Sequence, residues 1–378
     1  MDKHVYKKVT AIKQCYLLNL PDLRIAALFF LANQVVELLL ILLIGSEYSF
    51  GSEYSYICFW DCNWYVDIVK NGYDEEAHQG WKGDAANWVF FPGFPLAAGA
   101  IKYLTGLAPW ISVIITAKVF FFFAIFGFIR FCKVYSPSLP PLLAGAVIAF
   151  SPYSIYANVG YTESLFLFLT CVFFILLNKN NYLGAGLIGG ILSSIKVLGV
   201  VTIVPYGIGV IRHWRKLFKS RNYRLIVCLG FLCIPLGLAC FMFYLYWHVG
   251  DALAFSHAQR AWPRVFDNPL KYIEQGLRGD RYHKYLALTA IFSGLVCIRL
   301  FFQKRFELAS FTFLCTLIPL TSSLLSMPRY VAWQAPVLLV VAELIRKKQL
   351  WVLVLPCFII GLSYMYLAWI TRKGGFVI

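Results

Sequence analysis

A segment rich in aromatic and acidic residues, FWDCNWYVDIVKNGY, follows the first long apolar stretch of the chain. Its spacing predicts a helix with one shared face, formed by Trp60, Asp61, Trp64, Tyr65 and Ile68. Trp and Tyr rings settle at the headgroup depth of a membrane, so this helix is expected to lie in the interface. A carboxylate in that face can reach a lipid headgroup and take a proton from a hydroxyl group. We therefore predict that Asp61 is a catalytic residue.

Other polar groups close to Asp61 are not expected to act in catalysis. Asp74, Glu75 and Glu76 form a run that an ordinary solvated loop explains. Cys58 and Cys62 are four residues apart and can pair, but such cysteines are more often small hydrophobic residues. We prefer that second interpretation for the two cysteines.

Three further charges stand at the ends of apolar stretches. Glu163 opens one stretch, Lys196 interrupts a pair of short ones, and Arg329 starts a late one. Charges at membrane depth are candidates for function, although an acid such as Glu163 is also favoured in the first turn of a helix. A cation at this depth needs an anion, and a lipid-linked phosphate supplies one. The alternative is internal pairing with Glu163 or Asp61. We favour phosphate binding for Arg329 and leave both interpretations open for Lys196.

The segment 249–262 places several polar groups at helical spacing. Asp251, Gln259 and Arg260 can line the entrance of a substrate site, although a solvated interfacial helix explains the same pattern. His257 has no partners at the spacing of metal ligands, so we expect no metal. The predicted substrate-binding residues are Trp60, Trp64, Tyr65, Glu163, Lys196, Asp251, Gln259, Arg260, Arg329 and Tyr330.

The composition indicates an integral membrane protein. Of 378 residues, 60% are hydrophobic and 14% are charged, whereas soluble chains are about 25% charged. Several stretches reach the length of about 20 apolar residues that a membrane-spanning helix needs. The net charge of +16 does not indicate nucleic-acid binding, because Lys and Arg cluster in short loops between apolar stretches. No cleaved signal peptide is predicted at the N-terminus.

These stretches predict an all-α, polytopic membrane protein with about eleven membrane helices, forming one domain over residues 1–378. The pair 183–195 and 197–211 is too short for two crossings, so we expect a hairpin broken near Lys196 and Gly199. Residues 45–109 are expected to form a non-cytoplasmic loop with juxtamembrane helices. The expected spans are 24–44, 110–131, 140–158, 161–177, 183–195, 197–211, 224–247, 284–302, 306–324, 329–345 and 350–370.

The distribution of charge predicts the orientation of the chain. Most of the 34 Lys and Arg residues flank the spans on the side of the N-terminus, and the basic run RHWRKLFKSRNYR lies there. Most of the 18 Asp and Glu residues fall on the other side. Under the positive-inside rule, the basic side is cytoplasmic. The predicted site residues then converge on the non-cytoplasmic face, as a single active site requires.

The ordered set of motifs resembles the GPI mannosyltransferase II family and its bacterial relatives. It covers roughly residues 60–330, and its order and spacing carry the resemblance rather than any single motif. The matching motifs are Trp60-Asp61…Trp64-Tyr65…Gly72-Tyr73, Phe90-Phe91-Pro92…Pro95, Ser151-Pro152…Tyr161-Thr162-Glu163-Ser164, Lys196…Gly199, Gly250-Asp251…Ala254-Phe255…Ala258-Gln259…Trp262 and Pro328-Arg329-Tyr330.

The resemblance implies a GT-C type glycosyltransferase that takes a hexose, with mannose as the expected sugar, from a polyprenyl phosphate. The acceptor would be a lipid-linked or membrane-anchored molecule, and no cofactor or metal is expected. The resemblance assigns the catalytic aspartate of the family to Asp61. The segment after Asp251 looks more like the bacterial branch, which implies the bacterial inner membrane with the site facing the periplasm.

The sequence departs from the family pattern at two places. Lys196 stands where many bacterial relatives carry Arg, and it cannot offer a bidentate fork to a phosphate. Gly93-Phe94 replaces a more usual Leu-Tyr. The competing hypothesis is a lipid or solute transporter, which predicts internal repeats and polar residues on both faces. The sequence has neither feature.

Overall fold

The structure, a computed structural model, describes residues 19–45, 57–77, 85–215, 220–262, 264–347 and 350–371. These residues form helices joined by turns and short loops, and no β-strand occurs among them. The predicted all-α class is therefore confirmed.

The α-helices are α2 (Leu20–Gly45), α3 (Asp61–Asn71), α4 (Gly93–Thr105), α5 (Pro109–Tyr135), α6 (Pro141–Ala149), α7 (Glu163–Asn178), α8 (Tyr182–Ile195), α9 (Ile203–Arg212), α11 (Arg221–Cys233), α12 (Leu236–Val249), α13 (Ala254–His257), α14 (Pro269–Arg278), α15 (Arg281–Phe302), α16 (Phe306–Leu320), α17 (Met327–Ala332), α18 (Ala335–Lys347) and α19 (Trp351–Thr371). The short 3₁₀ helices are η1 (Asn87–Val89), η2 (Pro152–Ala157), η3 (Val197–Thr202) and η4 (Ala258–Ala261).

Helix α5 is the central element of the bundle. It begins at Pro109, whose missing N–H is not needed in a first turn, and its mostly apolar sequence buries one broad face. It packs against α7 and also touches α2, α3, α4 and α6. Ser164 Oγ donates a hydrogen bond of 2.8 Å to the Ala117 carbonyl, which ties the start of α7 to α5. Helix α5 therefore positions both α3 and α7, which carry predicted site residues.

Buried polar contacts hold α2 and α19 against this centre. Lys118 on α5 forms an ion pair with Glu37 on α2. Asn158 Nδ2 lies 2.9 Å from Asn33 Oδ1 and 2.8 Å from the hydroxyl of Tyr366. In a membrane, an apolar helix face contacts lipid as favourably as it contacts another helix, so hydrogen bonds between helices specify which faces pack together. This network fixes how the two terminal helices lie against the bundle.

The predicted hairpin at Lys196 is confirmed. Helix α8 ends at Lys196, whose backbone is extended, and the chain then folds back on itself. A Cβ on Gly199 would lie 2.1 Å from the carbonyl carbon of Leu192, so only glycine fits this close approach. The hydroxyl of Tyr182 at the start of α8 donates a hydrogen bond of 2.9 Å to the Gly209 carbonyl in α9. The turn of the hairpin therefore lies at Lys196.

Two predicted spans are interrupted where the sequence analysis expected continuous helices. Segment 140–158 consists of α6 and η2, because Pro152 cannot supply the N–H that a continuing helix needs. Segment 329–345 consists of the end of α17 followed by α18, with a break at Trp333 and Gln334.

Among the described residues, four helices are long and apolar enough to cross a membrane, namely α2, α5, α15 and α19. The number rises to five if α11 and α12, which meet at a bend of 43°, form one span. Helices α7, α8 and α16 are apolar but shorter, as is the segment of η3 and α9. The protein is thus an integral membrane protein, and the count of about eleven spans stays a prediction.

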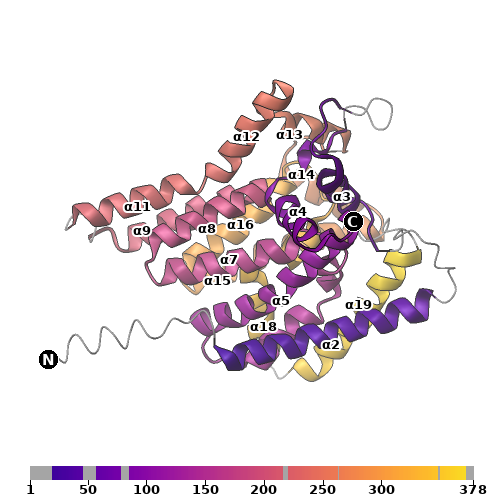
Figure 1. Ribbon diagram of the computed structural model, residues 1–378. Coiled ribbons are helices and arrows are strands. Elements are labelled where there is room, and N and C mark those ends of the chain that lie inside the picture. The colour runs from indigo at the N-terminus through magenta and orange to yellow at the C-terminus, as the bar shows by residue number, and fades with distance from the viewer. Residues whose placement is uncertain are drawn as a thin grey trace.

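The helices gather the site at one end of the bundle. In Figure 1, helices α7, α8, α9, α11, α15 and α16 run side by side, and α12 carries the chain to the end where α3, α4, α13 and α14 lie. The start of α7, the turn after α8 and the start of α17 contribute the remaining pieces of the site. Residues distant in the chain therefore meet at this end.

The close approach at Gly199 gives a prediction about stability. Replacing Gly199 with Ala should destabilise the fold by about 3 kcal/mol, because the added methyl group overpacks against backbone that cannot move aside. Gly207→Ala in α9 is the control, since a Cβ there meets nothing within 4 Å. Thermal unfolding in detergent measures both variants. Equal midpoints for the two variants would contradict the close packing of the hairpin.

Candidate active site

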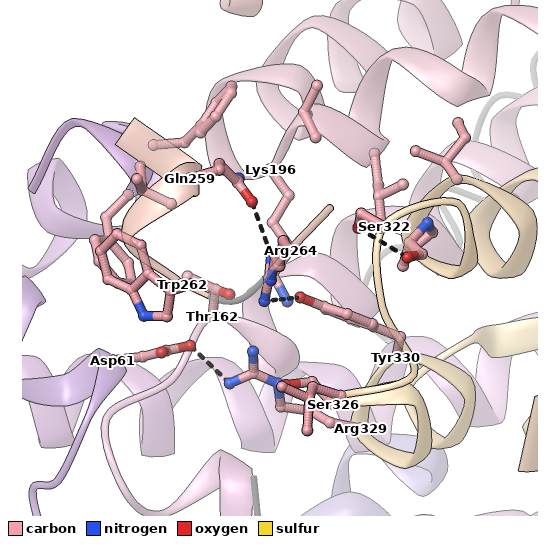
Figure 2. Close-up of a pocket in the computed structure, with 18 of the residues that line it drawn as sticks. Asp61, Thr162, Lys196, Gln259, Trp262, Arg264, Ser322, Ser326, Arg329 and Tyr330 are labelled. Atoms are coloured by element: carbon pink, nitrogen blue, oxygen red, sulfur yellow. Dashed lines mark hydrogen bonds and ion pairs between the residues drawn. The ribbon is translucent and has the colours of Figure 1, made fainter. Parts of the chain in front are cut away.

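A cavity of about 410 Å³ opens at this end of the bundle. Its walls come from α3, the segment around η1, the turn between α8 and η3, the segment after η4, and the end of α16 with the start of α17. Aromatic and apolar side chains make up most of the lining, and the charged side chains in it are Asp61, Lys196, Arg264 and Arg329. Figure 2 shows these four directed toward the same space.

Helix α3 presents Asp61 to the cavity at its first residue, where the helix dipole favours an acid. Tyr65, one turn later, is buried between the rings of Phe90 and Phe94, with centroids 5.2 and 4.9 Å away. Burial, reinforced by the Asp61 carboxylate, raises the pKa of Tyr65 well above its ordinary value. The hydroxyl of Tyr65 therefore stays protonated.

Trp60 does not share the helical face predicted for it. It precedes the helix, with φ 55° and ψ −114°, a backbone conformation that L-residues rarely adopt. Trp60 still lines the cavity. Trp64 lies behind the wall, with its ring stacked on Phe90 at 5.7 Å and against Trp262 at 5.7 Å. The aromatic stripe thus forms the wall beside Asp61, but Trp60 reaches that wall from a turn.

Four charged side chains form a continuous chain of ion pairs, which we call the floor of the site. Asp61, Arg329 and Lys196 line the cavity, whereas Glu163 is buried and does not line it. Arg329 Nη1 lies 2.6 Å from Asp61 Oδ2, and Arg329 Nε lies 3.6 Å from Glu163 Oε1. Lys196 Nζ donates to the same Glu163 oxygen at 2.7 Å. The rings of Tyr156 and Tyr161 lie 5.7 and 5.1 Å from the Arg329 guanidinium. Internal pairing, the alternative interpretation for Lys196 and Arg329, is therefore the arrangement in the structure.

Arg264 is a cation of the site that sequence reasoning missed. Its guanidinium donates hydrogen bonds of 3.0 Å to Gln259 Oε1 and 3.3 Å to the hydroxyl of Tyr330, both neutral partners (Figure 2). No carboxylate in the described part of the chain forms an ion pair with it. A signal was present in the sequence, because Pro263-Arg264 repeats the Pro-Arg pair of residues 328–329.

The net charge of the site follows from these contacts. Two carboxylates, Asp61 and Glu163, face three cations, Lys196, Arg329 and Arg264, so one positive charge is left over. The surplus lies at Arg264, whose hydrogen-bond partners carry no charge. A partly enclosed cavity with a surplus guanidinium is suited to bind an anion.

The segment 249–262 contributes only partly to the cavity. Gln259 and Trp262 line it, whereas Asp251 and Arg260 do not. Asp251 instead accepts a hydrogen bond of 2.6 Å from the His257 ring, and that contact lowers the pKa of Asp251. Arg260 is exposed. The substrate roles of Asp251 and Arg260 stay predictions with no contact to the cavity in their support.

Of the acids after α3, Asp74 has structural contacts. Asp74 and Asn87 exchange two hydrogen bonds, of 2.8 and 3.0 Å, that involve the backbone N–H of each. Glu75 and Glu76 are exposed. These positions fit the solvated loop expected from the sequence. Within the described ranges, no group of three His, Cys, Asp or Glu side chains is placed to hold a metal ion.

Cys58 and Cys62 form a disulfide, contrary to the preferred interpretation from the sequence. Their spacing puts Cys62 in the first turn of α3 and Cys58 in the segment just before it, with Cα atoms 5.1 Å apart. This separation lies within the range that a disulfide can bridge. The disulfide therefore brackets the position of Asp61.

An apolar helical bundle with a charged, aromatic cavity at one end defines an integral membrane protein with a binding or catalytic site at that end. Residues 88–328 match the family described as glycosyltransferase family 87, and the chain belongs to that family. The matched range includes Glu163, Lys196 and Arg264, while Asp61 and Arg329 lie outside it.

Curated relatives confirm the resemblance seen in the motifs. The chain is 25% identical over 207 residues to GPI alpha-1,6-mannosyltransferase 2 of Cricetulus griseus and of Mus musculus. It is 24% identical over 215 residues to the protein of the same name from Rattus norvegicus. Each alignment covers 50% of this chain and 40% of the relative, so the chain matches less than half the length of these proteins.

The buried ion pairs give a prediction about the floor of the site. Glu163→Gln should destabilise the protein by about 3–5 kcal/mol, because it removes the shared partner of two buried cations. Glu274→Gln is the control. Its pair with Arg278 is exposed on α14, and it should cost no more than about 1 kcal/mol. Thermal unfolding in detergent compares the two. A Glu163 variant as stable as the Glu274 variant would contradict this role for Glu163.

Proposed function

We propose that this protein transfers a hexose from a polyprenyl-phosphate donor to a hydroxyl group of a lipid-linked or membrane-anchored acceptor. Asp61 is the general base, and the whole chain acts as a single membrane-embedded catalytic domain. The observation that supports this most directly is the placement of the Asp61 carboxylate and the surplus Arg264 guanidinium around one cavity. Membership of a glycosyltransferase family argues against the transporter hypothesis.

The proposed reaction is a single displacement with inversion at the anomeric carbon. The acceptor oxygen attacks that carbon while Asp61 takes its proton. The bond between the anomeric carbon and the phosphate oxygen breaks, and the electron pair leaves with the polyprenyl phosphate. Negative charge grows on the departing phosphate, so cations fixed beside it stabilise the transition state.

Arg264 is the cation best suited to the donor phosphate. Lys196 and Arg329 already contact carboxylates at 2.7 and 2.6 Å, whereas the partners of Arg264 are neutral. Gln259 and Tyr330 hold its guanidinium in place, which reduces the entropy lost on binding. The bidentate fork that Lys196 cannot supply is thus available from Arg264.

Arg329 has a different role in this proposal. Its contact with Asp61, at 2.6 Å, holds the carboxylate in one orientation at the cavity. Arg329 contacts Asp61 through Oδ2, so Oδ1 is the oxygen proposed to take the acceptor proton. The pair at the floor of the site therefore prepares the base before substrates arrive.

We place the site on the non-cytoplasmic face of the membrane. The charge distribution of the loops supports this orientation. The Cys58–Cys62 disulfide beside Asp61 supports it independently, because disulfides persist in oxidising compartments. The resemblance to the bacterial branch suggests the periplasmic side of a bacterial inner membrane. The names of the curated relatives support mannose as the sugar.

Asp61→Asn tests the base. Transfer of mannose from polyprenyl-phosphate mannose to membrane glycolipids in proteoliposomes should slow by about 10²–10⁴-fold, because an amide cannot accept the proton. Asp67→Asn is the control, since Asp67 lies on the same helix and does not line the cavity. Transfer by the Asp61 variant at the rate of the control would rule out Asp61 as the base.

Arg264→Gln tests the phosphate ligand. The KM for the donor should rise, and kcat should fall, by a combined factor of about 10–100, the usual value of a hydrogen bond to a charged group. Arg278→Gln removes an exposed arginine on α14 that does not line the cavity, and it should leave both constants unchanged. Equal effects of the two substitutions would show that Arg264 acts only through the overall charge.

A further inference from the structure

The segment that leads into α3 contains a constraint that the proposed reaction does not use. The disulfide between Cys58 and Cys62 closes a small ring around Phe59, Trp60 and Asp61. Both cysteines are buried, with exposed fractions of 5% and 0%. A Cβ on Gly160 would lie 2.6 Å from the sulfur of Cys62, so the ring is seated closely against the loop before α7. The disulfide is therefore part of the packed wall of the site.

Inside the ring, the backbone of Trp60 is strained. Its φ of 55° and ψ of −114° belong to a region that glycine tolerates and a residue with a Cβ does not. Such a conformation persists only where the surroundings hold it in place, and these cases cluster at active sites. Trp60 directly precedes Asp61, so this peptide sets where α3 begins and where the carboxylate points.

Anchors on both sides of Trp60 oppose relaxation of the turn. The Phe59 carbonyl accepts hydrogen bonds from the Cys62 N–H at 3.2 Å and from the Tyr161 hydroxyl at 3.3 Å. The Ile57 carbonyl accepts one of 2.9 Å from Trp369 Nε1. These contacts are hydrogen bonds, whereas the disulfide is a covalent link across the same turn.

We propose that the Cys58–Cys62 disulfide is a positioning element of the active site, which holds the strained Trp60 turn and thereby sets the Asp61 carboxylate against Arg329. This inference rests on the proposed catalytic role of Asp61. Without the disulfide, Trp60 can return to a negative φ, which rotates the first peptide of α3. Displacing a catalytic group by about 1 Å can cost about 10²-fold in rate.

A general contribution to stability explains the disulfide less well. The stabilisation that a disulfide gives through the unfolded chain grows with the length of the loop it closes. Here the two cysteines are only four residues apart in sequence. The main effect is therefore expected to be local, on the turn that carries Asp61.

The test compares Cys58→Ala/Cys62→Ala with Cys228→Ala/Cys240→Ala, which removes two exposed free cysteines. With polyprenyl-phosphate mannose in proteoliposomes, kcat of the first variant should fall by about 10²-fold. Its KM for the donor should change by less than about threefold, because Arg264 lies on another element. The control should match the wild-type protein. Maleimide labelling of the denatured wild-type protein should gain two thiols on reduction.

The same cysteine substitutions in a protein that also carries Trp60→Gly separate a positioning role of the disulfide from a general contribution to stability. Glycine adopts a positive φ without strain, so in a Trp60→Gly background the loss of the disulfide should reduce kcat by less than about tenfold. An equal loss in both backgrounds would overturn the inference. The inference would also be overturned if the protein without the disulfide kept the wild-type kcat, or if reduction of the wild-type protein exposed no additional thiols. It would be overturned as well if kcat fell only together with the loss of the thermal unfolding transition.

Failure of this inference can be told from failure of the proposed function. If Asp61→Asn retains wild-type turnover, the proposed function fails, whatever the cysteine variants do. If Asp61→Asn is inactive while Cys58→Ala/Cys62→Ala keeps the wild-type kcat, only the positioning role of the disulfide fails.

Discussion

The arrangement of this site depends on the need to neutralise buried charge. Glu163 and Arg329 are 2% and 6% exposed, so neither can stay ionised without a partner of opposite sign. Their contacts, with Asp61 and Lys196 at the two ends, join α3, α17, α7 and the turn after α8. Moving any of these elements away would leave a charge unpaired at low dielectric. The ion pairs therefore fix the relative positions of segments that are far apart in the chain.

This constraint also separates the tasks of the three cations. The carboxylates neutralise Arg329 and Lys196, and those two cations hold the floor of the site in shape. Arg264 lies on an irregular segment and is held by an amide and a hydroxyl group. Its charge remains available to a ligand that carries its own negative charge, as a lipid-linked phosphate does. Structure and anion binding are thus assigned to different side chains.

Part of the site could be predicted from the sequence because it depends on local features. The apolar composition gave the all-α membrane class, and the interruption at Lys196 and Gly199 gave the hairpin. Asp61 was found from the aromatic residues around it. Each of these signals lies within one short segment, where helical period and composition are informative.

The remainder depends on contacts that no local pattern contains. Asp61 and Arg329 are 268 residues apart, so their pairing follows from the fold of the whole bundle, which brings the first residue of α3 and the side chain of α17 to one cavity. Arg264 stands in a loop without periodicity and was overlooked for that reason. Trp60 was assigned to a helical face because spacing alone does not reveal a positive φ. The disulfide was not preferred, because such cysteines are more often small hydrophobic residues than disulfide partners.

The most direct test of this account is a structure of the protein with a non-hydrolysable analogue of polyprenyl-phosphate mannose in lipid nanodiscs. The account predicts that the phosphate contacts the Arg264 guanidinium and that the anomeric carbon faces the cavity beside Asp61, with room between them for an acceptor hydroxyl. A phosphate bound away from Arg264, or a sugar held on the far side of the bundle from Asp61, would contradict it.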